Sequence, residues 1–329
     1  MRLSIIIPIY NVEKYVGATL ESIVNQNQDV LDYEVIIVND GTQDNSMQVV
    51  ETFINRLPIT IIHQDNKGLS GARNTGLRKA KGDYVWFVDS DDTLHEDAFR
   101  NVYKMLVEND AEIYTFGLLS VHEGKNDTKL MQTLYTKTPE KYINRISSGN
   151  QLHRIVGIGI AQKNIFKRSF LDCNNLRFLE GIYHEDLEFL ARAYFLAKRV
   201  YVTNTPMYVY LLRESGSIMT TRNERHLASG MKIIESFTQF RDQKAKNSFE
   251  KSLMNDRICG RVLNLLSLDD SQVEGYSAYM KSRKGKVRWM GIKAGLSSLD
   301  IMTKGKLVRL CLLILAPSIL PLIRRKSNR

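Results

Sequence analysis

Alternation of apolar segments with segments of helical spacing, over roughly the first ninety residues, constrains the fold more than any other feature. The apolar, β-branched segments cover residues 2–11, 33–40, 59–64 and 83–90. Between them, apolar residues recur at intervals of three and four over residues 13–26, 44–57 and 69–80. Strands that are apolar throughout and alternate with helices are typical of a parallel sheet covered on both faces. We therefore predict an α/β fold.

Polar side chains stand where three of these predicted strands end: Asn11, Asp40 and Asp89. In open parallel sheets, ligands bind beyond the carboxyl ends of the strands, so we expect the site at this edge. No glycine-rich phosphate-binding turn follows the first strand, where the chain reads PIYNVEKYV. A dinucleotide-binding fold and a P-loop enzyme are therefore both disfavoured.

Beyond about residue 110 the pattern weakens. We expect a strand over 111–120, a polar exposed excursion over 121–140, a strand and then a helix over 160–178, and a helix from about Asp186. Residues 199–213 read as strands split by Pro206. From residue 225 onward the composition is helical.

Cysteine usage indicates a reducing compartment. The 329 residues include only three cysteines, an odd number, far apart and without metal-ligand spacing. This argues against a disulfide framework. The first residues enter an apolar run directly and read as a strand rather than as a secretory segment. We expect a cytoplasmic protein.

The positive charge is concentrated in the last third of the chain. The formal net charge is +10, yet from residue 271 onward thirteen Lys or Arg residues face only two acidic ones, Glu274 and Asp300. This block alone has an excess of eleven positive charges, so the rest of the chain is close to neutral. A nucleic-acid partner is not expected, because no nucleic-acid-binding motif accompanies the charge.

An apolar stretch lies within this basic region, at residues 307–323. Arg309, Pro317 and Pro321 interrupt it, and it is too short for a membrane span. Cations around an apolar stretch favour a segment that lies on an anionic membrane surface. The alternative is a packed terminal helix with a solvated basic end. We expect a peripheral protein on the inner face of the cytoplasmic membrane.

Three carboxylates in four positions end the segment GDYVWFVDSDD, residues 82–92: Asp89, Asp91 and Asp92. Like charges this close disfavour one another's ionisation. A hard divalent cation, Mn²⁺ or Mg²⁺, removes that cost and binds substrate phosphates as well. The alternative is that Asp91 or Asp92 caps a helix over TLHEDAFRNVYKML. A cap accounts for one aspartate and not for three, so we predict a metal–phosphate site.

Five segments together carry a family resemblance: SIIIPIYN, VIIVNDGTQDNS, NKGLSGARNTGL, GDYVWFVDSDD and YHEDLEF. Their order and spacing resemble those of family 2 glycosyltransferases, inverting enzymes that use nucleotide-diphosphate sugars. The resemblance implies a Rossmann-like, mostly parallel sheet with helices on both faces, the nucleotide-diphospho-sugar transferase fold, followed here by a helical, basic C-terminal extension. It covers residues 1 to about 220. We expect a catalytic domain over 1–220, with a nucleotide-binding half (1–110) and an acceptor-side half (111–220), and a helical region with a membrane-facing tail over 221–329.

The resemblance also implies roles for residues at the strand ends. Pro8 and Tyr10 match positions that line the nucleotide base, and Asp40 matches the aspartate that accepts a hydrogen bond from it, commonly from uracil. Asn39 stands where many relatives have a second aspartate. Three residues match a segment close to the nucleotide and its phosphates: Asn66, Lys67 and Arg73. Guanidinium pairs well with phosphate, although Arg73 taken alone reads equally as a surface charge.

Asp89 and Asp91 match the D-x-D pair that holds ribose and metal, with Asp92 beside them. Asp186 in HED matches the general base. Taken alone, it reads as an acidic residue favoured at a helix N-terminus. Arg213 and Ser217 resemble a segment that closes over the diphosphate.

The implied activity is metal-dependent, inverting transfer from a nucleotide-diphospho-sugar, most simply a UDP-sugar, to a hydroxyl of a saccharide acceptor. The basic, apolar tail favours a lipid-linked acceptor in cell-surface polysaccharide assembly. Two other classes stay open. A sugar nucleotidyltransferase would carry a glycine-rich turn after the first strand, which this chain lacks. A non-catalytic sugar-nucleotide-binding protein at the membrane would not need both the aspartates at 89–92 and the HED motif at 184–186.

Overall fold

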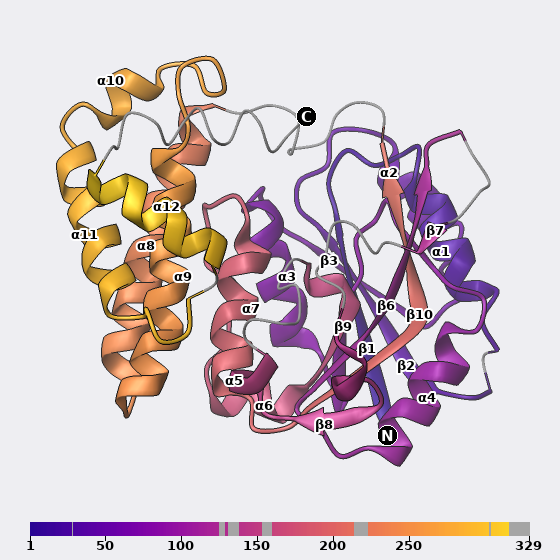
Figure 1. The fold of residues 1–329 in the computed structure, drawn as a ribbon. Coiled ribbons are helices and arrows are strands. Elements are labelled where there is room, and N and C mark those ends of the chain that lie inside the picture. The colour runs from indigo at the N-terminus through magenta and orange to yellow at the C-terminus, as the bar shows by residue number, and fades with distance from the viewer. Residues whose placement is uncertain are drawn as a thin grey trace. The chain divides into compact units, whose positions relative to one another are not determined.

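The computed structural model describes residues 1–27, 29–124, 129–130, 138–152, 160–213, 223–302 and 304–315 (Figure 1). Its first half contains the strands β1 (Arg2–Ile9), β2 (Asp32–Asn39), β3 (Ile59–His63) and β4 (Tyr84–Phe87). β1 pairs in parallel with β2 and with β4, and β2 pairs in parallel with β3. The predicted parallel sheet is therefore present, and its carboxyl ends share one edge.

The second half extends the same sheet with β5 (Thr93–Leu94), β6 (Ile113–His122), β7 (Lys129–Leu130), β8 (Arg145–Ser147), β9 (Asn164–Lys167) and β10 (Val200–Leu212). The strand order in the described part of the chain is β3-β2-β1-β4-β9-β6-β10-β5, with β7 beside β6 and β8 beside β10. β9 runs antiparallel to both β4 and β6, whereas β10 runs parallel to β6.

Alternate residues of β1 face opposite sides of the sheet and reach two separate cores. Leu3, Ile5 and Ile7 pack in one core with α1 (Val16–Val24), α2 (Ser46–Glu51) and α4 (Ala98–Glu108). Ile6 packs in the other with α3 (Gly68–Lys79), α6 (Arg168–Cys173) and α7 (Glu185–Leu196). Helices thus cover both faces, as predicted, and a short helix α5 (Gly149–Leu152) contacts α7.

One expectation about local structure is wrong, and one alternative reading is excluded. Residues 200–212 form one strand, β10, and Pro206 produces only register shifts against β6, because a bulge accommodates the missing N–H. The helix that the capping alternative places directly after the acidic residues begins only at Ala98, with Asp97 at its N-cap position. Asp92 therefore does not cap that helix, and β5 lies between them.

The chain divides into two compact units, one with residues 1–181 and 185–215, the other with 182–184 and 216–329. The second unit is helical, as expected for the C-terminal extension: α8 (Glu224–Lys244), α9 (Ser248–Leu266), α10 (Tyr276–Met280), α11 (Lys284–Leu296) and α12 (Lys304–Leu315). Within the described residues, no helix combines the length and the apolar character needed to cross a membrane.

Candidate functional site

Asp40 follows β2 at the carboxyl edge of the sheet and is 2 % exposed. Its Oδ1 accepts hydrogen bonds from Gln64 Nε2 at 2.6 Å and from the backbone N–H of Lys67 at 2.8 Å. These donors come from the loop between β3 and α3. They fix the carboxylate in one orientation, as a residue that recognises a ligand group requires.

Pro8 lies in β1 beyond its last pair with β4, Ile6–Phe87, while its pairing with β2 continues to Ile9. Its missing N–H faces the side where β4 has already ended, so the ladder loses no hydrogen bond. Tyr10, the next residue but one, is exposed. Asn66 and Lys67 are exposed in the β3–α3 loop, where Asn66 Oδ1 accepts from the Gly68 N–H at 3.1 Å.

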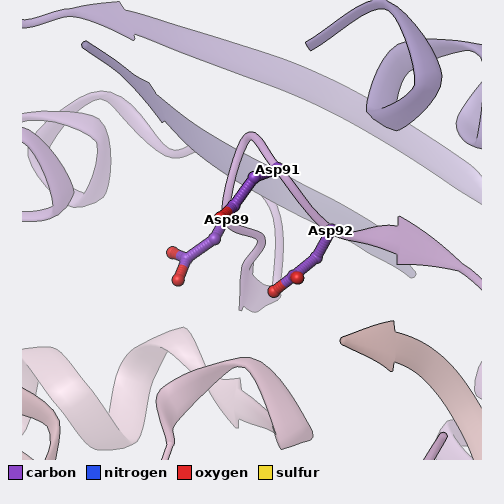
Figure 2. A group of neighbouring side chains, drawn as sticks. All are labelled: Asp89, Asp91 and Asp92. Carbon is purple, nitrogen blue, oxygen red and sulfur yellow. The ribbon is translucent and has the colours of Figure 1, made fainter. Parts of the chain in front are cut away.

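Asp89, Asp91 and Asp92, here called the acidic cluster, lie on the loop between β4 and β5 (Figure 2). One oxygen of each carboxylate lies within 4.8 Å of the others. Burial, followed by the charge of Asp89, raises the pKa of Asp91, and burial with Asp91 and Asp89 raises that of Asp92. The fold therefore holds the three carboxyl groups close together, although their like charges repel one another.

β10 fixes the buried member of the acidic cluster. Asp92 Oδ2 accepts from Tyr208 Oη at 2.7 Å, and Oδ1 accepts from the Leu211 N–H at 2.8 Å. The Tyr208 hydroxyl also accepts from the Asp89 N–H at 3.1 Å. One tyrosine thus positions both ends of the loop.

Arg213 forms an ion pair with Asp91 through Nη2. It follows β10 directly, and its Cζ lies 4.3 Å from the centroid of the Tyr15 ring. Tyr15 in turn donates to Glu123 Oε1 at 2.9 Å. The guanidinium of Arg213 therefore binds the carboxylate of Asp91, which was predicted to be a metal ligand. Ser217 lies outside the described residues.

Arg73, on α3, lies between the acidic cluster and the predicted base, with a side chain that is 0 % exposed. Nη2 binds Asp89 Oδ1 at 2.7 Å, and Nη1 binds Asp186 Oδ1 at 2.6 Å and Glu185 Oε1 at 3.0 Å. This arrangement does not support the expected direct contact of Arg73 with phosphate, because the guanidinium is fully buried and no part of it is accessible to a ligand. Its observed role is to join carboxylates from the β4–β5 loop and α7.

Asp186 stands in the first turn of α7. Its Oδ2 accepts from the Ala161 N–H at 3.2 Å. Burial, with the neighbouring Glu185 and Asp89 charges, raises the pKa of Asp186 to about 7, although Arg73 opposes the shift. A carboxyl group with a pKa near neutrality is suited to proton transfer.

Two residues at this edge escaped the sequence analysis, Gln162 and Tyr208. The Gln162 side chain is buried and Nε2 donates to Asp89 Oδ2. Its own backbone carbonyl accepts from Trp86 Nε1 at 2.7 Å, which anchors the 3₁₀ turn Ala161–Lys163 to β4. Nothing in the local sequence marks either residue, because both approach the acidic cluster only through the sheet order.

We expect Arg73→Met to destabilise the protein by about 3–5 kcal/mol at neutral pH, because the buried Asp186 and the partly buried Asp89 and Glu185 would lose their shared cation. The loss should shrink at pH 5.5, because burial raises the pKa of both Asp186 and Glu185 and their protonated forms leave less uncompensated charge. Thermal unfolding at both pH values measures this, with the exposed Lys79→Met on the same helix as control. An equal loss at both values would contradict the charge argument.

The acidic cluster fits a divalent metal ion by the chemistry of its donors. It offers carboxylate oxygens only, the ligands that Mg²⁺ and Mn²⁺ prefer. Asp91 is its most accessible member, with a side chain that is 24 % exposed. Both oxygens of Asp92 already accept hydrogen bonds, so Asp92 contributes through its remaining lone pairs or by orienting the loop.

A mixed α/β sheet with an acidic cluster beyond the carboxyl ends of its parallel strands is the arrangement expected of a glycosyltransferase with the GT-A fold. The sequence model of glycosyl transferase family 2 matches residues 4–171, about half of the chain. The chain therefore belongs to glycosyl transferase family 2. Glycosyltransferase GlyG of Streptococcus pneumoniae is 30 % identical over 246 residues, which cover 72 % of this chain and 78 % of that protein.

A second relative is TarS of Staphylococcus aureus, a poly(ribitol-phosphate) β-N-acetylglucosaminyltransferase. It is 28 % identical over 225 residues, 67 % of this chain but only 37 % of that protein. The structure of TarS 1–349 in complex with UDP-GlcNAc superposes with a TM-score of 0.67 at 20 % identity, covering 99 % of this chain and 92 % of that one. This likeness shows the shared fold.

A more distant structure shares the fold as well. The mannosyltransferase PcManGT from Pyrobaculum calidifontis, solved with GDP-Man and Mn²⁺, has a TM-score of 0.52 at 14 % identity, over 98 % of this chain and 87 % of that one. The predicted family and fold are thus confirmed, and the chain is a glycosyltransferase.

Proposed function

We propose that this glycosyltransferase transfers a sugar from a nucleotide-diphospho-sugar, in the first instance a UDP-sugar, to a hydroxyl group of a saccharide, with inversion. The observation that carries the proposal is the arrangement around Arg73, which holds Asp89 of the acidic cluster and Asp186 on opposite nitrogens. A donor-binding carboxylate and a proton acceptor are thereby kept apart at one edge of the sheet. The UDP complexes of the structurally similar TarS support the choice of donor.

The nucleotide would bind over the ends of β1 and β2. Pro8 and Tyr10 would contact the base, and Asp40, already oriented by Gln64, would accept a hydrogen bond from it. Exposed Asn66 and Lys67 stand beside Asp40 and suit contacts with ribose or phosphate. Asp89 would hold the ribose, and Arg213 with Ser217 would contact the diphosphate.

The acidic cluster would hold the metal ion, with Asp91 as its most accessible ligand. A bound Mn²⁺ or Mg²⁺ supplies positive charge that stabilises the departing diphosphate. Arg73 lies between Asp89 and Asp186 and would keep the metal-binding carboxylates separate from the proposed base.

Asp186 would take the proton of the acceptor hydroxyl as its oxygen attacks the anomeric carbon. The bond from that carbon to the diphosphate oxygen breaks on the opposite face, so the configuration inverts. The Arg73 guanidinium and the Ala161 N–H hold the Asp186 carboxylate in place. The nucleoside diphosphate leaves with the bonding electron pair.

A panel of UDP- and GDP-sugars, each assayed for hydrolysis and for transfer to saccharide acceptors with Mn²⁺, tests the proposal. We expect one donor to be consumed with release of the nucleoside diphosphate. Release of pyrophosphate from a nucleoside triphosphate and a sugar phosphate would support the nucleotidyltransferase instead. Donor binding without any turnover, across donors and acceptors, would support a binding protein.

We expect Arg213→Met to tighten binding of Mn²⁺ in the absence of nucleotide by about tenfold, because the ion pair that competes for Asp91 disappears. The same change should weaken binding of the UDP–Mn²⁺ complex, since the diphosphate would lose a cationic partner. Calorimetric titration with Mn²⁺ alone and with UDP–Mn²⁺ measures both. Changes of the same sign in the two titrations would contradict this double role.

We further propose residues 1–220 as the catalytic domain, with the two halves set out above, and residues 221–329 as a helical region that brings the enzyme to the inner face of the cytoplasmic membrane. A lipid-linked saccharide acceptor in cell-surface polysaccharide assembly would be encountered there. The excess of eleven positive charges from residue 271 onward supports attraction to anionic lipid.

Deletion of residues 304–329 should reduce the membrane-bound fraction of the enzyme while leaving donor hydrolysis close to that of the full chain. The physical reason is that seven of the thirteen cations and the apolar stretch are removed, whereas the acidic cluster lies in the other unit. Flotation with anionic vesicles, with hydrolysis measured in parallel, checks both. A full chain that ignores anionic vesicles at low salt would show that the tail is a packed, solvated segment.

A further inference from the structure

The second unit carries an exposed tryptophan on a basic helix face. Trp289, on α11, is 64 % exposed, and three further exposed residues lie on the same side of the helix: Lys286, Lys293 and Leu296. Their spacing of three, four and three residues places them in one stripe, here called the α11 face. A tryptophan this exposed requires an explanation, because large aromatic side chains are usually mostly buried.

The opposite side of α11 explains why the α11 face cannot turn inward. A Cβ atom at Gly291 would lie 2.4 Å from Val262 on α9, and one at Gly295 would lie 2.6 Å from Leu310 on α12. These close approaches fix the rotation of α11 about its axis. Arg288 adds hydrogen bonds to the carbonyls of Leu313 and Ile314 at 3.1 and 3.0 Å.

The neighbouring helix α12 likewise exposes apolar residues together with a lysine. Its exposed residues are mainly apolar and include one lysine: Lys304, Gly305, Leu307, Val308, Cys311, Ile314 and Leu315. Apolar side chains mixed with lysines on adjacent helices are typical of segments that lie at a membrane interface. Lysine stems can bury their methylene groups while the charged ends reach phosphate.

We propose that the α11 face docks on an anionic lipid surface, with Trp289 inserted at the level of the headgroups and Lys286 and Lys293 contacting lipid phosphates. This proposal rests on the membrane association proposed above and assigns it to a folded surface rather than to the terminal tail alone. A second copy of the chain is disfavoured as the occupant, because two faces that each carry lysines would repel each other.

The two tryptophans of the chain make the test specific. Trp86, in the first unit, is 0 % exposed and donates to the Gln162 carbonyl, so its emission should not respond to lipid. We expect vesicles that contain phosphatidylglycerol to shift the emission of the full-length protein to shorter wavelength, with quenching by dibrominated lipid. Neutral phosphatidylcholine vesicles, or high salt, should leave the emission unchanged.

Charge variants complete the experiment. Lys286→Gln combined with Lys293→Gln should weaken vesicle binding by about tenfold or more, and Trp289→Ser should abolish the emission shift and weaken binding. The exposed pair Lys104→Gln and Lys198→Gln in the first unit removes the same charge and should change binding far less. Donor hydrolysis confirms that each variant is folded.

Three results would overturn the proposal. Protein that floats with vesicles while Trp289 emission stays constant would assign the membrane contact to the tail and leave the membrane association itself standing. Failure to bind anionic vesicles at low salt would remove both. A concentration-dependent emission shift without lipid, accompanied by dimers in sedimentation, would show that a second copy covers the α11 face.

Discussion

Asp91→Ala is expected to lower transfer by about 10³-fold or more, since the metal ion supplies several kcal/mol of charge stabilisation to the leaving diphosphate. Within the acidic cluster, the side chain of Asp91 is slightly more exposed than that of Asp89. Its partner in the structure is Arg213, a cation. Binding of UDP should lose its dependence on Mn²⁺ in this variant. Transfer assays and calorimetric titration of UDP with and without Mn²⁺ measure the two effects.

The stability of Asp91→Ala separates a functional loss from a folding defect. The pKa of Asp91 is raised by burial and by Asp89, so its ionised form is disfavoured in the folded protein above its ordinary pKa. Removing the carboxylate removes that cost, and the melting temperature at pH 8 should not fall. Asp97→Ala, at an exposed N-cap position, serves as the control. Full activity of the wild-type enzyme after thorough chelation would refute the metal role.

Asp186→Asn should lower transfer by about 10²-fold or more while leaving donor affinity within a few-fold of wild type. Asparagine keeps the size of the side chain but cannot take a proton from the acceptor. Asp186 lies on the far side of Arg73 from the acidic cluster, so the nucleotide should not sense the change directly. Single-turnover transfer and equilibrium UDP-sugar binding distinguish the two effects.

Glu185→Gln is the matched control for Asp186→Asn. Glu185 pairs with the same nitrogen of Arg73, at 3.0 Å, in the same helical turn. If only loss of an ion pair matters, both variants should be impaired equally. We expect the glutamine variant to lose less than about tenfold. Near-normal turnover of Asp186→Asn would transfer the role of base to Glu185, and equal losses of binding and turnover would indicate a structural role.

The same assignment predicts the pH dependence of the wild-type enzyme. Burial, with the charges of Glu185 and Asp89, raises the pKa of Asp186 to about 7. Below that pH the carboxyl group is protonated and cannot accept the proton of the acceptor. We therefore expect kcat/KM to fall about tenfold per pH unit below pH 7 and to level off above it. A flat profile between pH 5 and 8 would argue against this group as the base.

The sequence by itself determined the class of fold. Apolar strands that alternate with amphipathic helices leave few arrangements other than a parallel sheet covered on both faces, and β1 to β4 have that arrangement. It also located polar residues at the strand ends, since parallel strands share one carboxyl edge. The acidic cluster was visible for the same reason: its three carboxylates are neighbours in the chain.

Contacts between distant segments could not be predicted in this way. Arg73 reads as a helix-surface cation, yet Asp186, 113 positions further along, meets it inside the protein. Likewise, Tyr208 and Gln162 reach the acidic cluster only because β9 inserts antiparallel beside β4 and β10 lies two strands further along the sheet. Sheet order depends on the summed packing of all strands, which no local pattern records.

The rotation of α11 about its axis also depends on contacts between distant segments of the chain. The sequence indicated a basic, helical C-terminal region, but not which side of each helix would be covered. Gly291 and Gly295 permit a close approach to α9 and α12 only on their own side, and this packing leaves Trp289 facing outward. Local chemistry thus fixed which groups are available, whereas tertiary packing decided which of them meet and which remain exposed, because burial is a property of the whole chain.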